Sequence, residues 1–323
     1  MTINQPSQPD FHVIFGTGPL GMSVMRELLQ RGKNVRMVNR SGKAEVPPGV
    51  EIIAGDAYNT DFTRQVCSGA SVVYQCAQPP YQEWTEKFPA LQASILEGAA
   101  NAGARFIIGE NLYMYGEVNG PIHEGMPYNP HTRKGKVRAE MAEAALTAHQ
   151  QGKVCAAIGR GSDFYGPGVL DSTLGERAIL PALQGKTASL VGRLDLPHTY
   201  TVIDDFGKAL VILGEREAAL GQAWHIPNPP TLTQRQLMTL FFEVIGQPPK
   251  MSGMGRWMMS IGGLFIPEAR ESVEMMYEFE KPFVVDHSKY ARAFGDHATP
   301  HREAVRQTID WYRKWMVRNA ASH

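Results

Sequence analysis

The sequence predicts an α/β protein that consists of a doubly wound parallel sheet and a smaller, mostly helical C-terminal lobe. Two observations support this fold class. Short apolar runs alternate with amphipathic helical stretches over the first half of the chain, as in a sheet whose strands are joined by helices. A glycine-rich turn also follows the first apolar run directly. A length of 323 residues allows one large domain and a second, smaller one.

The expected elements follow in chain order. The first strand occupies residues 11–15 and ends at Gly16, and a helix over residues 20–31 stops at Gly32. Residues 202–213 are expected to form the end of a strand and a helix that return to the main sheet. Further strands are expected at residues 35–38, 52–54, 72–74, 106–108 and 154–158, and helices at residues 89–102 and 135–150.

Composition and charge exclude several classes of partner. Lys and Arg together number 32, as do Asp and Glu, and no run of like charges suggests binding to nucleic acid or to a membrane surface. Residues 1–10 lack the basic and apolar regions of a secretory signal. The longest apolar stretch, residues 258–266, is far shorter than the ~20 residues that span a bilayer. We therefore expect a cytoplasmic protein without a membrane anchor.

Cysteine and histidine spacing gives no metal site. The cysteines are odd in number and lack a CxxC pattern, so Cys67, Cys76 and Cys155 are expected to be unpaired, buried thiols. Three histidines show no ligand-like spacing with one another or with carboxylates: His123, His198 and His225.

The glycine-rich turn predicts a dinucleotide site. Residues 16–21 read Gly-Thr-Gly-Pro-Leu-Gly, the GxGxxG spacing, between an apolar strand and an amphipathic helix. Gly16 allows the turn, Gly18 lets the backbone approach the pyrophosphate, and Gly21 lets helix and strand pack closely. Pro19 and Leu20 begin the helix, whose first N–H groups would face the phosphates. The alternative is an ordinary glycine-rich turn that binds nothing.

The end of the second strand decides between NAD and NADP. An NAD site usually places an acidic residue there to accept a hydrogen bond from the ribose 2′-hydroxyl, but none occurs between Glu27 and Glu45. Arg40 can instead form a charge-assisted contact with a 2′-phosphate, and Asn39 and Ser41 add neutral donors. NADP(H) is therefore the predicted cofactor. A solvated loop arginine is the alternative for Arg40.

The alternation of strands and helices breaks down in the second half of the chain, where proline-rich segments follow. We assign residues 1–172 and 199–222 to an NADP-binding domain of the Rossmann type. We assign residues 173–198 and 223–323 to a substrate-binding cap lobe.

Five further segments accompany the glycine turn: Ala54-Gly55-Asp56, Tyr115-Gly116, Lys136 to Glu140, Arg160 to Gly168, and Thr201 to Asp205. Together with that turn they resemble the extended short-chain dehydrogenase/reductase family, also called the NAD-dependent epimerase/dehydratase family, up to about residue 226.

The resemblance implies several contacts to the cofactor. Asp56 and Ala57 would contact the adenine, although Asp56 has an alternative role as a turn-stabilising carboxylate. The loop after the fourth strand would line the cofactor through Ala77, Gln78 and Pro79, and the nicotinamide would lie near Gly161 and Ser162. The resemblance also implies a homodimer through the helices that contain Lys136 and residues 89–102.

Family enzymes use a Tyr-x-x-x-Lys pair, in which the lysine and the cofactor lower the phenol pKa from about 10 until it exchanges a proton near neutral pH. Lys136 matches the family's lysine and would hold the nicotinamide ribose. Thr132 stands where the family has its tyrosine, and Asn111 stands where it has a serine. A threonine hydroxyl is too weak an acid to donate a proton unaided, whereas Asn111 could polarise a carbonyl.

A substitute proton donor must therefore come from nearby side chains. Tyr113 shares strand-like alternation with Asn111 and Tyr115, so these three could project to one side. A packed aromatic is the alternative for each tyrosine, and a surface residue is the alternative for the histidine. The candidates are Tyr113, Tyr115, Tyr81, Tyr128 and His131. The pair Asp204 and Asp205 is expected to cap a helix and anchor a loop.

The composition of the cap lobe favours an apolar substrate. A diphosphate would need cations, and the lobe offers few: Arg177, Lys186, Arg193 and Arg256. It is rich in methionine and aromatic residues, namely Trp257, Met258, Met259, Phe265, Met275, Met276 and Tyr277. Packing of the lobe's own core or of a dimer interface is an equal alternative. Trp84 could also wall the nicotinamide side of the cleft.

Three functions remain open. The first is an NADP(H)-dependent oxidoreductase for a small, largely apolar carbonyl or alcohol, with Lys136, Asn111 and a displaced tyrosine in place of the usual residues. The second is a non-catalytic NADP(H)-binding sensor or regulator, which the missing tyrosine favours. The third is a sugar-nucleotide epimerase or dehydratase, ranked last because the tyrosine is missing and the cap is apolar.

Overall fold

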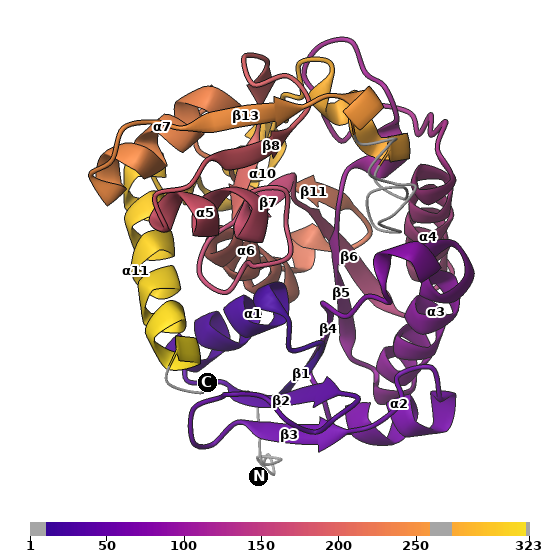
Figure 1. Ribbon diagram of the computed structural model, residues 1–323. Helices are drawn as coiled ribbons and strands as arrows, with labels where there is room; N and C mark the ends of the chain where they lie inside the picture. Colours follow the sequence, from indigo (N-terminus) through magenta and orange to yellow (C-terminus); the bar gives the residue numbers. More distant parts are fainter. Residues whose placement is uncertain (1–10, 259–272, 321–323) are drawn as a thin grey trace, which may run out of the picture. The chain divides into compact units, whose positions relative to one another are not determined.

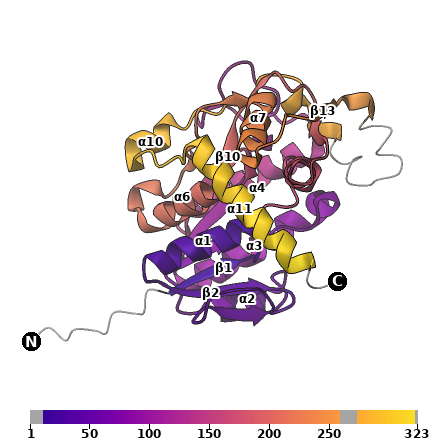
Figure 2. The same ribbon diagram turned by 60° about the vertical axis from the view of Figure 1, so that its left-hand side comes forward.

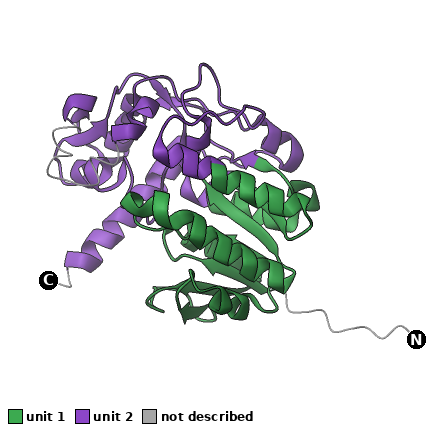
Figure 3. Ribbon diagram, turned by 90° about the vertical axis from the view of Figure 1, so that its right-hand side faces the viewer, with its two compact units in different colours: residues 1–110, 140–159, 207–223 green, residues 111–139, 160–206, 224–323 purple. Residues whose placement is uncertain are grey.

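The structure is a computed structural model that describes residues 11–258 and 273–320. The chain divides into two compact units, shown in different colours in Figure 3. Unit 1 contains residues 1–110, 140–159 and 207–223, and unit 2 contains residues 111–139, 160–206 and 224–323.

A seven-stranded sheet is the framework of unit 1, with the strand order β11-β6-β5-β4-β1-β2-β3 (Figure 1). The pairs β1–β2, β2–β3, β1–β4 and β4–β5 are all parallel. Because the chain builds outward from β1 first in one direction and then in the other, the sheet is doubly wound, which confirms the predicted fold class. The strands are β1 (Phe11–Phe15), β2 (Asn34–Asn39), β3 (Glu51–Ala54), β4 (Val72–Gln75), β5 (Arg105–Glu110), β6 (Cys155–Arg160) and β11 (Ala223–His225).

Helices cover both faces of this sheet (Figure 1). One face carries α1 (Pro19–Gln30) and α6 (Ile203–Glu215), and the other carries α2 (Thr60–Cys67), α3 (Trp84–Ala102) and α4 (Arg133–Gln150). An ion pair of 2.5 Å between Arg31 and Glu215 joins the ends of α1 and α6. The side chain of Gln92 donates to the carbonyl of Met141 at 2.7 Å and joins α3 to α4. Covered on both faces, the central strands bury continuous apolar runs, as parallel sheets require.

Unit 2 combines short strands with helices around its own core. Three two-stranded ladders form, β7–β10, β8–β13 and β9–β12, and the first two are parallel. Helices α5, α7 and α11 pack on a core that includes Ile179, Phe241 and Ile309. Figure 2 shows α11 as the long C-terminal helix. The elements are β7 (Asp163–Tyr165), α5 (Leu180–Leu183), β8 (Ala188–Val191), β9 (Pro197–His198), β10 (Tyr200–Val202), β12 (Leu232–Thr233), α7 (Gln234–Ile245), β13 (Met251–Met254), α10 (Ser288–Phe294) and α11 (His301–Ala320).

The structure corrects two strand assignments. The strand that ends at Val202 does not join the main sheet, because β10 pairs with β7, with Tyr200 opposite Asp163. The main sheet is completed instead by β11, a three-residue strand that the sequence assigned to the cap lobe. A run this short carries too little periodicity to be recognised from sequence.

The cysteines follow the prediction in part. All three are free; Cys67 is buried, and Cys76 is half-buried. Cys155 is exposed, which contradicts the expectation of a buried thiol, because it is the first residue of β6, before that strand enters the core. Across the described ranges, no helix is both long enough and apolar enough to cross a membrane.

Candidate functional site

The glycine turn of unit 1 has the close contacts that its sequence predicts. Gly16 has a φ of +106°, and a Cβ there would lie 2.7 Å from the backbone nitrogen of Ala77. A Cβ at Gly21 would lie 2.0 Å from the carbonyl oxygen of Gly16. Both positions therefore exclude any side chain, since β1, α1 and the loop after β4 meet there.

The second glycine of this turn differs from the other two. A Cβ at Gly18 would meet no atom within 4 Å, so the missing side chain leaves open space rather than a packing contact. Gly18 is the N-cap of α1, makes no side-chain cap, and is followed by Pro19. An uncapped helix N-terminus beside open space is an anion-binding arrangement, so these residues fit the pyrophosphate of a dinucleotide.

The end of β2 separates the roles of three predicted cofactor residues. The Asn39 amide donates to the Thr17 hydroxyl and to the Lys43 carbonyl, both at 2.9 Å, and thereby ties β2 to the glycine turn. The Ser41 hydroxyl lies 3.3 Å from Asn39 Oδ1. Arg40 is exposed, and no ion-pair partner for it occurs in residues 11–258 or 273–320. Arg40 is thus a cation that is available at this strand end.

The loops after β3 and β4 hold the other predicted contacts of unit 1. Asp56 is exposed and accepts a hydrogen bond from the Tyr58 backbone N–H at 3.0 Å, which is the turn-stabilising role given above as its alternative. The indole of Trp84 donates to the Pro79 carbonyl at 3.1 Å and is itself buried, so it fixes this loop from inside. Gln78 is exposed, Ala77 is half-buried against Gly16, and Ala57 is half-buried.

In unit 2, Thr132 caps the helix that carries Lys136. The Thr132 hydroxyl accepts the backbone N–H of Gly135 at 3.0 Å, and its carbonyl accepts the N–H of Lys136 at 3.1 Å. This is the N-cap arrangement, and the Thr132 side chain is 6% exposed. Lys136 is exposed, and among the described residues it has no ion-pair partner. Its neighbour Lys134 is buried and paired with Glu274 at 2.8 Å.

The segment that follows β5 does not have strand geometry. Asn111 Oδ1 accepts the N–H of Tyr113 at 3.3 Å, and Tyr113–Tyr115 form a 3-10 turn. The alternation proposed for Asn111, Tyr113 and Tyr115 is therefore wrong, because a period of three places their side chains in different directions. Tyr113 is half-buried, whereas Tyr115 is buried.

A buried network surrounds Arg160 in unit 2. Its guanidinium donates to the Tyr115 hydroxyl at 2.6 Å and, through a short bond, to the Tyr128 hydroxyl. The Tyr115 hydroxyl donates to His225 Nε2 at 2.9 Å, and His225 Nδ1 lies 3.0 Å from the carbonyl oxygen of Asp286. Burial, aided by Arg160, lowers the pKa of His225 to about 3, so its ring is neutral and accepts from Tyr115.

The predicted nicotinamide residues lie next to this network in the chain. Gly161 packs against the ring of Phe206, where a Cβ would approach within 2.6 Å. The Ser162 hydroxyl donates to the Thr199 carbonyl at 2.6 Å. Asp205 accepts from both the backbone and the hydroxyl of Thr299 at 2.7 Å, which confirms its loop-anchoring role.

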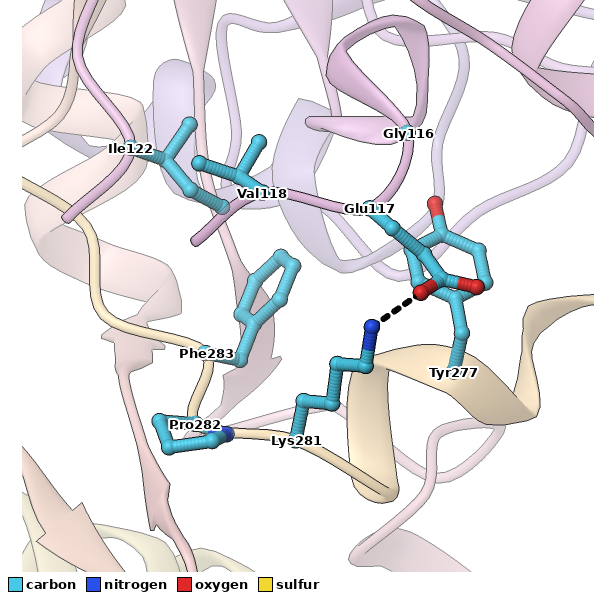
Figure 4. A pocket seen from close by; sticks show the side chains of 8 residues that line it. All are labelled: Gly116, Glu117, Val118, Ile122, Tyr277, Lys281, Pro282 and Phe283. Carbon is cyan, nitrogen blue, oxygen red and sulfur yellow. Dashed lines mark hydrogen bonds and ion pairs between the residues drawn. The ribbon is translucent and has the colours of Figure 1, made fainter. Parts of the chain in front are cut away.

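Two features of unit 2 have no signal in the sequence. His198 donates to Asp163 at 2.8 Å, and its ring stacks on Phe279 and Phe283 with centroid distances of 4.8 and 5.1 Å. Figure 4 shows a small pocket beside this stack in which the ion pair of Glu117 and Lys281 faces apolar side chains. Its other lining residues are Gly116, Val118, Ile122, Tyr277, Pro282 and Phe283. These residues meet only in three dimensions, since Glu117 and Lys281 are 164 positions apart.

The cap residues divide among three locations. Met275, Met276 and Tyr277 are buried, and Met276 packs with Val191 and Phe279 in a small core. Trp257 and Met258 are exposed. Met259 and Phe265 lie outside the described residues. Within the described part of the chain, no group of three or more His, Cys, Asp or Glu side chains could hold a metal ion.

Comparison with known proteins identifies the family of this chain. Residues 13–226 match the model of the NAD dependent epimerase/dehydratase family, from β1 through the glycine turn to β11. The chain belongs to this family. The resemblance seen in the sequence is thereby confirmed.

One curated relative is sterol-4-alpha-carboxylate 3-dehydrogenase, decarboxylating, of Mus musculus, which is 27% identical over 232 residues. The match covers 67% of this chain and 63% of the relative's length.

Solved structures share the fold over nearly the whole chain. UDP-glucuronic acid 4-epimerase from Bacillus cereus, in complex with NAD, superposes with a TM-score of 0.78 and 17% identity over 94% of this chain and 99% of its own. Epimerase Mth375 from Methanothermobacter thermautotrophicus superposes with a TM-score of 0.80 and 15% identity, over 95% of this chain and 94% of its own. The dTDP-glucose 4,6-dehydratase DesIV from Streptomyces venezuelae superposes with a TM-score of 0.77 and 17% identity, over 94% of this chain and 97% of its own.

Proposed function

We propose that this protein is an NADP(H)-dependent oxidoreductase that acts on a small, largely apolar carbonyl or alcohol. The observation that carries the cofactor choice is the end of β2, where exposed Arg40 stands in place of a carboxylate. A guanidinium can bind a 2′-phosphate through two charge-assisted hydrogen bonds, whereas it offers no particular acceptor to a ribose hydroxyl. The NAD-bound epimerase of Bacillus cereus supports a nicotinamide dinucleotide in general.

The glycine turn, Lys136 and Asn111 each have one role in this proposal. The open face at Gly18 and the N-terminus of α1 bind the pyrophosphate, and Lys136 holds the nicotinamide ribose. Asn111 donates its side-chain N–H to a carbonyl oxygen, because its Oδ1 is already occupied by the Tyr113 N–H. When bound, the dinucleotide supplies or accepts hydride.

The charges around residues 273–281 favour an uncharged substrate over a sugar nucleotide. Three cations of unit 2 that could meet a diphosphate are already paired with carboxylates: Lys134 with Glu274, Arg256 with Glu280, and Lys281 with Glu117. A diphosphate that used these three cations would have to displace their carboxylates. The mouse relative, named as a dehydrogenase of sterol carboxylates, supports an apolar class of substrate.

A second candidate function follows from Thr132. Its hydroxyl accepts the Gly135 N–H and caps α4, so the position that resembles the family's tyrosine serves helix stability here. A sensor or regulator that binds NADP(H) without turnover would need Thr132 only as this helix cap and not as a proton donor.

Calorimetric titration with NADPH and NADH tests the cofactor choice. We expect tighter binding of NADPH, and Arg40→Asp should weaken NADPH binding by about tenfold or more while sparing NADH. Arg216→Asp, at another exposed arginine of unit 1, is the matched control and should change neither affinity. Equal affinity of the unaltered protein for the two cofactors would contradict the assignment.

A turnover screen separates the enzyme from the sensor. NADPH oxidation is followed across aldehydes, ketones, quinones and keto-steroids, alongside UDP- and dTDP-sugars. Turnover of uncharged carbonyls supports the oxidoreductase. Tight NADPH binding without turnover of any compound supports the sensor, and conversion of a sugar nucleotide would overturn the substrate class proposed here.

A further inference from the structure

Carbonyl reduction needs a proton donor, and the capping role of Thr132 leaves that donor unassigned. A threonine hydroxyl is a weak acid even when free, and here its oxygen already accepts the Gly135 N–H. The donor must therefore be another side chain of the chain.

The structure separates the candidate acids from one another. Tyr115 is 1% exposed and bonded to both Arg160 and His225, and burial raises the pKa of its phenol to about 12. His131 is exposed and lies 3.8 Å from Glu117. Tyr81 belongs to unit 1, where its ring packs edge-on against Trp84. Burial thus weakens the case for Tyr115, an exposed position weakens it for His131, and Tyr81 lies outside the unit that contains Asn111 and Lys136.

Tyr128 is less buried than Tyr115 and contacts a fixed cation. Its side chain is half-buried, and its hydroxyl accepts a short hydrogen bond from Nη2 of Arg160. The Arg160 guanidinium carbon also lies 5.0 Å from the centre of the Tyr128 ring. Arg160 is fully buried and stays protonated at any ordinary pH, so it presents a permanent positive charge to this hydroxyl. A cation that donates to a phenol oxygen favours the phenolate, as a lysine does for a catalytic tyrosine.

The backbone places Tyr128 among the other residues of the proposed site in unit 2. Asn129 donates its N–H to the Met114 carbonyl at 3.0 Å, which holds Tyr128 beside the turn that follows Asn111. Gly135 contacts that same turn, since a Cβ there would lie 2.7 Å from the Tyr113 carbonyl. Arg160 immediately precedes Gly161. Tyr128 therefore belongs to the group of packed segments that contains Asn111 and the start of α4.

We propose that Tyr128, held and polarised by Arg160, is the acid–base residue of this protein, an assignment that rests on the oxidoreductase function proposed above. In reduction, a bound nicotinamide dinucleotide would supply the hydride for the carbonyl carbon. The Oη–H bond of Tyr128 breaks as the O–H bond of the product alcohol forms, which leaves a phenolate hydrogen-bonded to Arg160. Water restores the proton to this half-buried side chain, and oxidation of an alcohol runs the same transfer in reverse.

Polar and charged groups of unit 2 surround Tyr128. Arg160 and the Tyr115 phenol contact it directly, and His225 lies behind Tyr115 as a neutral ring. The Glu124 carboxylate accepts the His225 backbone N–H at 2.8 Å and opposes ionisation of this cluster. Lys289 adds a second positive charge, which acts on His225 and Glu124.

The test compares Tyr128→Phe with Tyr113→Phe and His198→Gln, the last of which removes the other buried acid–base pair of unit 2. On a carbonyl found by the screen, Tyr128→Phe should lower kcat by about 100-fold or more and leave NADPH affinity unchanged. His198→Gln, as the control, should keep most of the activity. Tyr113→Phe tests the remaining candidate, and loss of activity in Tyr113→Phe rather than in Tyr128→Phe would overturn the assignment. Arg160→Lys should retain a cation and shift the pH profile, while Tyr128→Phe should abolish the profile's titrating limb.

Full activity of Tyr128→Phe alongside an active parent would overturn the assignment of Tyr128 alone. An inactive parent protein would instead contradict the proposed oxidoreductase function.

Discussion

Glu278 illustrates how much a single buried side chain depends on its surroundings. Its carboxyl is 3% exposed, and Oε1 has no hydrogen-bond partner in the structure. Burial, together with the negative charge of Asp163, holds the pKa of the Glu278 carboxyl well above its usual range. The group is therefore neutral in the folded protein at pH values where it is ionised in the unfolded chain.

This raised pKa predicts a pH-dependent effect of Glu278→Gln. The folded state holds a proton that the unfolded state releases above about pH 4.3, so the free energy of unfolding of the parent falls as pH rises between the two pKa values. Glu278→Gln removes this proton uptake and should gain stability relative to the parent at pH 8 but little at pH 4. Urea unfolding across this range measures the effect, with exposed Glu143→Gln as the control. A constant difference between Glu278→Gln and the parent would contradict the prediction.

At the scale of elements, the start of α1 contains two glycines with different roles: Gly21 is needed for packing, and Gly18 is needed for the proposed binding of the cofactor. Gly18 has a φ of −73°, and a Cβ there would meet no atom, so Gly18→Ala should fold with an unchanged Tm. Its methyl group would occupy the space where the pyrophosphate approaches the backbone, so NADPH affinity should fall by about tenfold or more. Gly255→Ala, where a Cβ would make only an ordinary contact of 3.9 Å with Trp257 Cδ1, serves as the control for both measurements. Unchanged NADPH binding by Gly18→Ala would remove the turn from the proposed cofactor site.

Helix α4 gives a second prediction at this scale. Thr132→Ala should lower the free energy of unfolding by about 1 kcal/mol, because the Gly135 N–H loses its acceptor, whereas Thr132→Ser should stay close to the parent. Thr147→Ala, at an exposed threonine of the same helix, provides the comparison in urea unfolding. If Thr132→Ala leaves stability unchanged but abolishes turnover, the hydroxyl acts on substrate rather than as a cap.

At the scale of the whole molecule, the three thiols report on global unfolding. Cys155 is exposed, whereas burial raises the pKa of the Cys67 thiol to about 12 and raises that of Cys76 as well. Since the thiolate is the reactive form, an aromatic disulfide reagent should label one thiol rapidly in the native protein and all three in denaturant. Cys155→Ser should abolish the rapid phase. Rapid labelling of Cys67 in the native state would show that α2 opens readily.

Much of the fold was predictable because local patterns specify it. The apolar runs, the GxGxxG turn and the helical stretches each depend on neighbours within a few residues, and the parallel order follows from their alternation. The cap on α4 also had a local signal, a threonine before a helix, but the helix was expected to begin at Gly135 rather than Arg133. The pairing of β10 with β7 had no such signal, because three-residue strands lack a readable period.

By itself the sequence determined the doubly wound sheet, the dinucleotide turn and the absence of a carboxylate beside Arg40. The tertiary structure alone decided which polar side chains form hydrogen bonds or ion pairs, and with which partners. Arg160 reaches Tyr128 across 32 positions, and His198 reaches Asp163 across 35. Such contacts form only when the folded backbone brings distant segments together, and burial then fixes the charge state of each group.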